Sequence, residues 1–342
     1  MNNQIKILFF KKITIINLND ILLYFLGGAK LNYKHIFGPI PSRRLGLSLG
    51  VDMVPLKICN LDCVYCECGK TVKKTNKRDR YIDPDEILNE LDDILSGKPT
   101  IDYITLTGSG EPTLSIDLGY IINSIKKKHP DYKIAVLTNS VLLTDPIVRN
   151  ELLDVSVVLP SIDGVSDEVF FKIDKPEEGI EIKSIIDGLI EFRKLFSGQI
   201  WIELFVIHGI NDMKSELYKF KEVFTLINPD RIQLNSLDRP GVESWVRESD
   251  YSDLLLIKDY FYPLTVDIVG RFKTNIESTN DNSNLIDRIV NALKRRPCTL
   301  DDLSIITGAE KQIIINALKT QIDSGLIIIE KLSRGDFYKF VF

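Results

Sequence analysis

Apolar and polar positions follow two different periods along residues 48–235. Apolar residues three and four positions apart indicate helices, and the short apolar runs between them indicate strands. The expected strands are 48–54, 101–107, 133–138, 155–160, 200–207 and 231–235, and the expected helices are 84–96, 116–128, 146–153, 180–196 and 214–226. Strands and helices that alternate at this pace predict βα units around a parallel sheet.

The same pattern predicts the domain organisation. Six strands are too few for a complete barrel of eight βα units. An extended segment precedes the first strand from residue 33, and another helix is expected at 250–260. Residues 273–284 are polar and turn-rich, as is typical of a linker. We therefore expect an α/β domain at 32–272, a linker at 273–284 and a small module at 285–342.

The first 31 residues contain apolar stretches that charged residues interrupt, among them Lys11, Lys12 and Asp20. No continuous apolar span of about 20 residues exists there, so a transmembrane helix is not expected. We interpret residues 1–31 as a peripheral extension without chemistry, and we expect a cytoplasmic protein with no membrane partner.

Composition places few limits on function. The chain has 342 residues, of which 44% are hydrophobic and 27% charged, and its net charge is −5. Such a chain has no overall basic field, so contact with a nucleic acid requires a local patch. Residues 70–80 hold six Lys or Arg residues, which form either a solvated loop or a contact for a polyanionic substrate. Arg43 and Arg44 either bind a carboxylate or phosphate or tie their own loop to the sheet.

Four of the five cysteines lie between Cys59 and Cys68. Disulfides are not expected in a chain of this size with clustered thiols. Zinc sites commonly use separated pairs of ligands, and no second Cys or His pair exists. Soft thiolates in one short loop favour an iron–sulfur cluster. Cys298, far away, is expected to be a buried or inert thiol.

The spacing C-x3-C-x2-C, with Tyr65 before the third cysteine, resembles the signature of the radical S-adenosylmethionine (SAM) superfamily. The resemblance implies that Cys59, Cys63 and Cys66 hold a [4Fe–4S] cluster that cleaves SAM reductively to a 5′-deoxyadenosyl radical. It also implies a partial (β/α)6 TIM barrel and an electron donor of flavodoxin or ferredoxin type. Cys68 is then an unused thiol, a ligand or a radical-quenching group.

A second segment resembles the Gly-Gly-Glu-Pro segment of that superfamily. Gly108, Ser109, Gly110, Glu111 and Pro112 follow the second expected strand, and the resemblance implies that Glu111 holds the amino group of SAM. Polar residues at later strand ends are expected at the same mouth of the barrel. We assign SAM or substrate contacts to Asn139, Ser161, Asp163 and Asn235.

Within the superfamily, the chain resembles the wyosine-synthase-like branch. The shared segments include Gly-Pro-Ile-Pro-Ser-Arg-Arg-Leu-Gly at 38–46 and Leu-Asn-Ser-Leu-Asp-Arg-Pro at 234–240. The resemblance favours RNA or tRNA as the substrate.

The small module supplies the alternatives. Three helical patterns and a hairpin pattern around Gly335 look like a winged helix-turn-helix, but nine basic residues stand against seven acidic ones, which is little charge for reading DNA. One alternative is therefore modification of a protein or peptide that this module presents. A different class is a non-catalytic iron–sulfur sensor that regulates transcription through the module.

Overall fold

The computed structural model describes residues 33–269, 285–332 and 334–341, and the chain from His35 onward forms one compact unit. The predicted extension at 1–31 and the predicted linker at 273–284 lie outside the described residues. Within the described ranges, no helix is long and apolar enough to cross a membrane.

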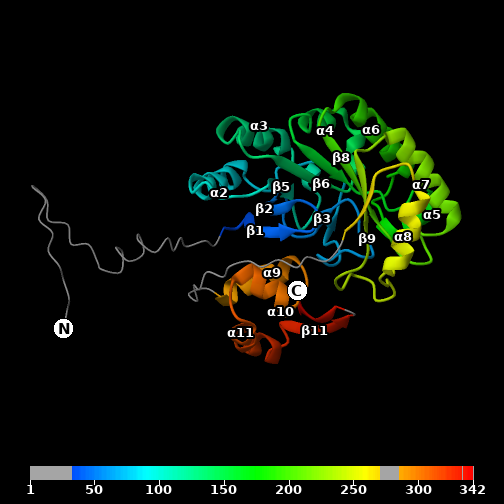
Figure 1. Ribbon diagram of the computed structural model, residues 1–342. Helices are drawn as coiled ribbons and strands as arrows, with labels where there is room; N and C mark the ends of the chain where they lie inside the picture. Colours follow the sequence, from blue (N-terminus) through cyan, green and yellow to red (C-terminus); the bar gives the residue numbers. More distant parts are fainter. Residues whose placement is uncertain (1–32, 270–284, 333, 342) are drawn as a thin grey trace, which may run out of the picture. The chain divides into compact units, whose positions relative to one another are not determined.

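The main sheet has eight strands in the order β1-β2-β5-β6-β7-β8-β9-β10 (Figure 1). β1 is antiparallel to β2, and each later pair of neighbours is parallel. The strands are β1 (Ile36–Ser42), β2 (Gly46–Asp52), β5 (Tyr103–Thr107), β6 (Ile134–Thr138), β7 (Val157–Pro160), β8 (Gln199–Phe205), β9 (Arg231–Asn235) and β10 (Val266–Ile268). The predicted α/β fold with a parallel sheet is confirmed.

Helices connect the strands and line the outer side of the sheet (Figure 1). They are α2 (Pro84–Ser96), α3 (Leu118–Lys128), α4 (Pro146–Glu151), α5 (Asp167–Asp174), α6 (Ile182–Leu195), α7 (Lys214–Ile227) and α8 (Tyr251–Tyr260). Helix α2 shows how local sequence sets these bounds. Asp83 accepts a hydrogen bond from the Asp85 amide, Pro84 occupies the first turn, and Gly97 ends the helix.

Several elements were not predicted as strands or helices, among them β1, β10 and α5. The extended segment before the first strand is β1, which pairs with β2 through a ladder with a bulge between Phe37 and Ile40. β10 has only three residues, too few to show a period, and helix α5 has only eight. Short elements such as these depend on their neighbours in space more than on their own pattern.

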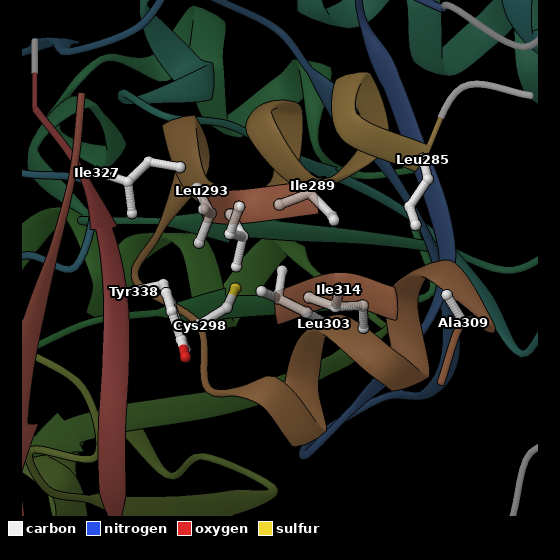
Figure 2. Close-up of a cluster of buried hydrophobic side chains, with 10 residues drawn as sticks. Leu285, Ile289, Leu293, Cys298, Leu303, Ala309, Ile314, Ile327 and Tyr338 are labelled. Atoms are coloured by element: carbon white, nitrogen blue, oxygen red, sulfur yellow. The ribbon is translucent and has the colours of Figure 1, made fainter. Parts of the chain in front are cut away.

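Residues 285–341 contain helices α9 (Leu285–Arg295), α10 (Leu300–Thr307) and α11 (Lys311–Asp323), followed by the antiparallel pair β11 (Ile327–Leu332) and β12 (Gly335–Phe340). Figure 2 shows that side chains from these elements form a core of their own, in which the predicted buried thiol of Cys298 is packed. Three helices and a hairpin are the expected elements, and the identity of the module as a winged helix remains a prediction.

Candidate functional site

The cysteine loop, residues 53–72, leaves the end of β2 and is held on several sides. The short strands β3 (Ile58–Cys59) and β4 (Lys73–Lys74) pair in parallel and close its base. The Asp62 and Val64 amides donate hydrogen bonds to the carbonyls of Asp174 and Ile173, both 2.9 Å long, at the end of α5. The loop is therefore fixed to the sheet and to α5 by main-chain bonds.

The three predicted cluster ligands have different surroundings within this loop. Lys57 Nζ donates to Cys66 Sγ at 3.1 Å, and Cys63 Sγ donates to Asp174 Oδ1 at 3.3 Å. Cys59 Sγ lies 3.5 Å from the Leu61 amide and 3.5 Å from Asn139 Nδ2. All three sulfurs thus have polar neighbours that can fix the direction of the side chain.

Hydrogen bonding from Cys68, helped by the positive charge of Lys57, lowers the pKa of Cys66 to about 6. Burial, with the Glu111 carboxylate adding to it, raises the pKa of Cys59 to about 12. Cys66 beside the Lys57 cation, with three more cysteines in the same loop, is a donor set that fits an iron–sulfur cluster. Across the described ranges, no three His, Cys, Asp or Glu side chains are arranged to hold one metal ion.

The Gly-Ser-Gly-Glu-Pro segment lies directly against the start of the cysteine loop. The Lys57 amide donates to the Ser109 carbonyl at 2.8 Å, and the Glu111 amide donates to the Ile58 carbonyl at 3.1 Å. A Cβ atom on Gly110 would lie 2.1 Å from the Ile58 oxygen, so only glycine allows this approach. Pro112 begins the short 3-10 helix η1 (Pro112–Leu114), which Glu111 caps.

The Glu111 carboxylate is buried and joins three segments. Oε1 accepts hydrogen bonds from the Thr113 amide, the Thr113 hydroxyl and the Thr138 hydroxyl, and Oε2 accepts one from the Asn139 amide at 2.8 Å. Burial raises the pKa of Glu111. Glu111 therefore braces the end of β6 against η1, a role that the sequence did not show.

Asn139 continues this path to the cysteines. Its side-chain nitrogen Nδ2 donates to Asn60 Oδ1 at 2.6 Å and lies 3.5 Å from Cys59 Sγ. Glu111, Asn139, Asn60 and Cys59 thus form a continuous chain of polar contacts. The structure brings the predicted SAM segment and the predicted cluster loop together.

Asn139, Ser161 and Asp163 line one cavity of about 40 Å³ beside the cysteine loop. Asp163 Oδ1 accepts from the Phe205 amide at 2.7 Å, and Oδ2 accepts from the Tyr65 hydroxyl. The Tyr65 ring stacks on Phe205 with 3.9 Å between centroids. The cavity has room for about three water molecules, and Asp163 ties Tyr65 of the cysteine loop to the end of β8.

Asn235 does not line this cavity. Its Nδ2 donates to Glu203 Oε1 at 2.9 Å, and Glu203 also pairs with Arg44. Arg43 pairs with Asp238 at 3.3 Å. Of the two roles expected for Arg43 and Arg44, the structure shows the one in which they tie their loop to the sheet and its loops.

The basic run is used mostly within the molecule. Arg78 donates to the carbonyls of Thr113 and Ser115 and pairs with Glu151, and Arg80 makes a two-pronged contact with Asp117. Lys74 donates to the carbonyls of Lys175 and Pro176. Lys70, Lys73 and Lys77 are also exposed, and of these Lys77 pairs with Asp79 at 2.9 Å and Lys73 lies 5.4 Å from the centre of the Tyr81 ring.

Three residues of the site escaped sequence reasoning. Lys57 stands two positions before Cys59, and that nearness was the available signal. Asp174 contacts Cys63 from 111 positions away, and Arg239 contacts Glu67 from 172 positions away. Arg239 belongs to the recognised segment 234–240, but local sequence does not show which distant residue Arg239 or Asp174 contacts.

Comparison with known proteins adds a family. A model described as the radical SAM superfamily matches residues 53–220. The chain is 31% identical over 312 residues to a UPF0026 protein of Helicobacter pylori, covering 91% of this chain and 99% of that protein.

A longer relative carries a different name. The chain is 34% identical over 305 residues to a Brachyspira hyodysenteriae protein named GTPase Obg, covering 87% of this chain but only 44% of that protein. The chain thus spans less than half of that relative, and its sequence has no G-x-x-x-x-G-K-[ST] motif. The structure is similar, with a TM-score of 0.53 and 14% identity, to a radical SAM methyltransferase from Sphaerobacter thermophilus, covering 67% of each chain. That similarity concerns the fold alone.

Proposed function

Because the chain belongs to the UPF0026 family and is an enzyme of the radical SAM type, which uses a [4Fe–4S] cluster and SAM, we propose that Cys59, Cys63 and Cys66 hold the cluster. The observation that carries the proposal is the polar path from Glu111 through Asn139 to Cys59. It supports SAM binding between the Gly-Ser-Gly-Glu-Pro segment and the cysteine loop. When bound, the cluster supplies the electron that cleaves SAM.

The residues around the loop have separate roles in this proposal. Glu111 and the backbone of Gly108, Ser109, Gly110 and Pro112 shape the wall that receives the amino end of SAM. Asn139, Ser161 and Asp163 line the adjoining cavity, and they and Asn235 serve the rest of SAM or the substrate. An electron donor is required by the radical SAM class, and we propose a flavodoxin or ferredoxin. Cys68, two positions after Cys66, is left outside the proposed ligand set.

The test is anaerobic reconstitution with iron and sulfide, reduction with dithionite and addition of SAM. Wild type should form 5′-deoxyadenosine, and Cys63→Ala should not. Cys298→Ala, which removes a thiol from the core of the small module, is the matched control and should retain activity. A stable cluster that neither binds nor cleaves SAM would contradict the proposal.

Glu111→Gln separates SAM binding from cluster binding. Glutamine keeps the size of the side chain but places an NH2 group among hydrogen-bond donors. We expect the variant to retain its cluster and to lose SAM cleavage. Unchanged cleavage would remove Glu111 from the SAM site.

We propose RNA as the first substrate class. The wyosine-synthase-like segments and the exposed Lys70, Lys73 and Lys77 next to the cysteine loop support it. Replacing these three lysines with serine should reduce the slope of log affinity against log salt for cellular RNA by about 2. The same change at Lys126, Lys127 and Lys128 in α3 is the control.

A protein or peptide substrate is the second candidate, because the small module exposes apolar side chains. Ile313 and Ile315 on α11 are 38% and 39% exposed, and Ile328 and Ile329 on β11 are 45% and 46% exposed. RNA retention that does not respond to salt would favour this candidate. A non-catalytic sensor is not proposed, because the radical SAM class is that of an enzyme.

A further inference from the structure

Lys57 occupies an unusual place at the entrance to the cysteine loop. Its side chain is buried and its backbone has a φ of +58°, in the left-handed region that residues other than glycine seldom adopt. Its amide donates to Ser109, and its carbonyl accepts hydrogen bonds from the amides of Val72 and Lys73. Strained backbone that is held by the structure around it is found often at functional sites.

The side chain explains why a lysine stands there. Buried lysines require a partner, which is usually a carboxylate. The partner of Lys57 is instead the sulfur of Cys66, 3.1 Å from Nζ. The positive charge of Lys57 also acts on Cys59 and Cys68. One cation therefore faces the thiols of the loop, and its hydrogen bond reaches one of the three proposed ligands.

We propose that Lys57 is a positioning residue that raises the reduction potential of the cluster by donating a hydrogen bond and positive charge to Cys66. This inference rests on the proposed function, because it takes Cys66 as a ligand. Lys57 enters no bond-making step: one electron passes from the external reductant to the cluster, and the ammonium group keeps its proton.

The direction follows from electrostatics. Reduction adds one negative charge to the cluster, and a nearby cation stabilises the reduced form more than the oxidised form. Hydrogen bonds to ligand sulfurs and net charge are established determinants of cluster potential. Loss of both contributions should make the cluster harder to reduce.

The experiment is a potentiometric titration of the reconstituted protein, followed by electron paramagnetic resonance of the reduced cluster. Lys57→Met should lower the equilibrium constant for reduction at least tenfold, which is 59 mV for one electron. Lys57→Arg keeps the charge, and its equilibrium constant for reduction should stay within threefold of the wild-type value. Lys126→Met, at an exposed lysine of α3 outside the cysteine loop, is the control and should leave the potential unchanged.

The outcomes distinguish this inference from the function beneath it. If wild type assembles no cluster, the proposed function fails. If the cluster assembles and the equilibrium constant for its reduction in Lys57→Met is within twofold of that in wild type, the role of Lys57 is refuted while the function stands. If Lys57→Met does not fold, Lys57→Gln takes its place with the same tenfold expectation and the same refuting result.

Discussion

Replacing Arg239 with methionine should destabilise the protein by about 3 kcal/mol. Arg239 lies in the loop after β9 and is 4% exposed. Its guanidinium is 3.4 Å from both oxygens of Glu67, which stands between Cys66 and Cys68, and 3.7 Å from Asp302 of α10. Arg239 thus links the cysteine loop to the small module.

The magnitude follows from the charges that remain. Removing one partner of a buried ion pair costs about 3–5 kcal/mol, because the other charge stays buried without compensation. Here Arg43 lies 3.9 Å from Glu67, and Arg334 pairs with Asp302. Since these two cations retain part of the compensation, the lower end of the range applies.

Thermal unfolding followed by circular dichroism, under anaerobic conditions, is the assay. With an unfolding entropy of about 2.1 cal/mol/K per residue, a unit of about 300 residues loses about 1.6 °C per kcal/mol, so a fall of about 5 °C is expected. Arg247→Met changes an exposed arginine in the same loop and is the control. A variant Arg239→Met that melts within about 1 °C of wild type would refute the reasoning.

Two further stability predictions follow from the packing. Gly110→Ala should lower the free energy of unfolding by about 1–3 kcal/mol, since its Cβ would meet the Ile58 carbonyl. Gly97→Ala, whose Cβ would have its nearest neighbour at 3.4 Å, should change the melting temperature little. Ile289→Ala should lower the free energy of unfolding, measured by denaturant titration, by about 2–5 kcal/mol, because this side chain is fully buried in the core of Figure 2. Ile328→Ala, at an exposed site, should leave the free energy of unfolding nearly unchanged. Equal stability of either pair of variants would contradict the packing described.

The order of strands and helices and the cysteine loop could be predicted from local sequence. Hydrophobic periods report burial within one element, and six predicted strands correspond to β2 and β5–β9. The Gly-Ser-Gly-Glu-Pro segment was also recognisable, and it lies against Lys57 and Ile58 at the start of the cysteine loop. The strand β10 was missed because three residues carry no period.

The partners of charged residues were decided only by the tertiary structure. In the sequence, Arg78 resembles the lysines beside it, yet it pairs with Glu151, 73 positions away, while Lys73 is exposed. Arg44 likewise finds Glu203 from 159 positions away. A local pattern records whether a side chain is apolar, because burial repeats with the period of its own element. It does not record which distant carboxylate or thiol a cation meets, because chain topology brings those groups together.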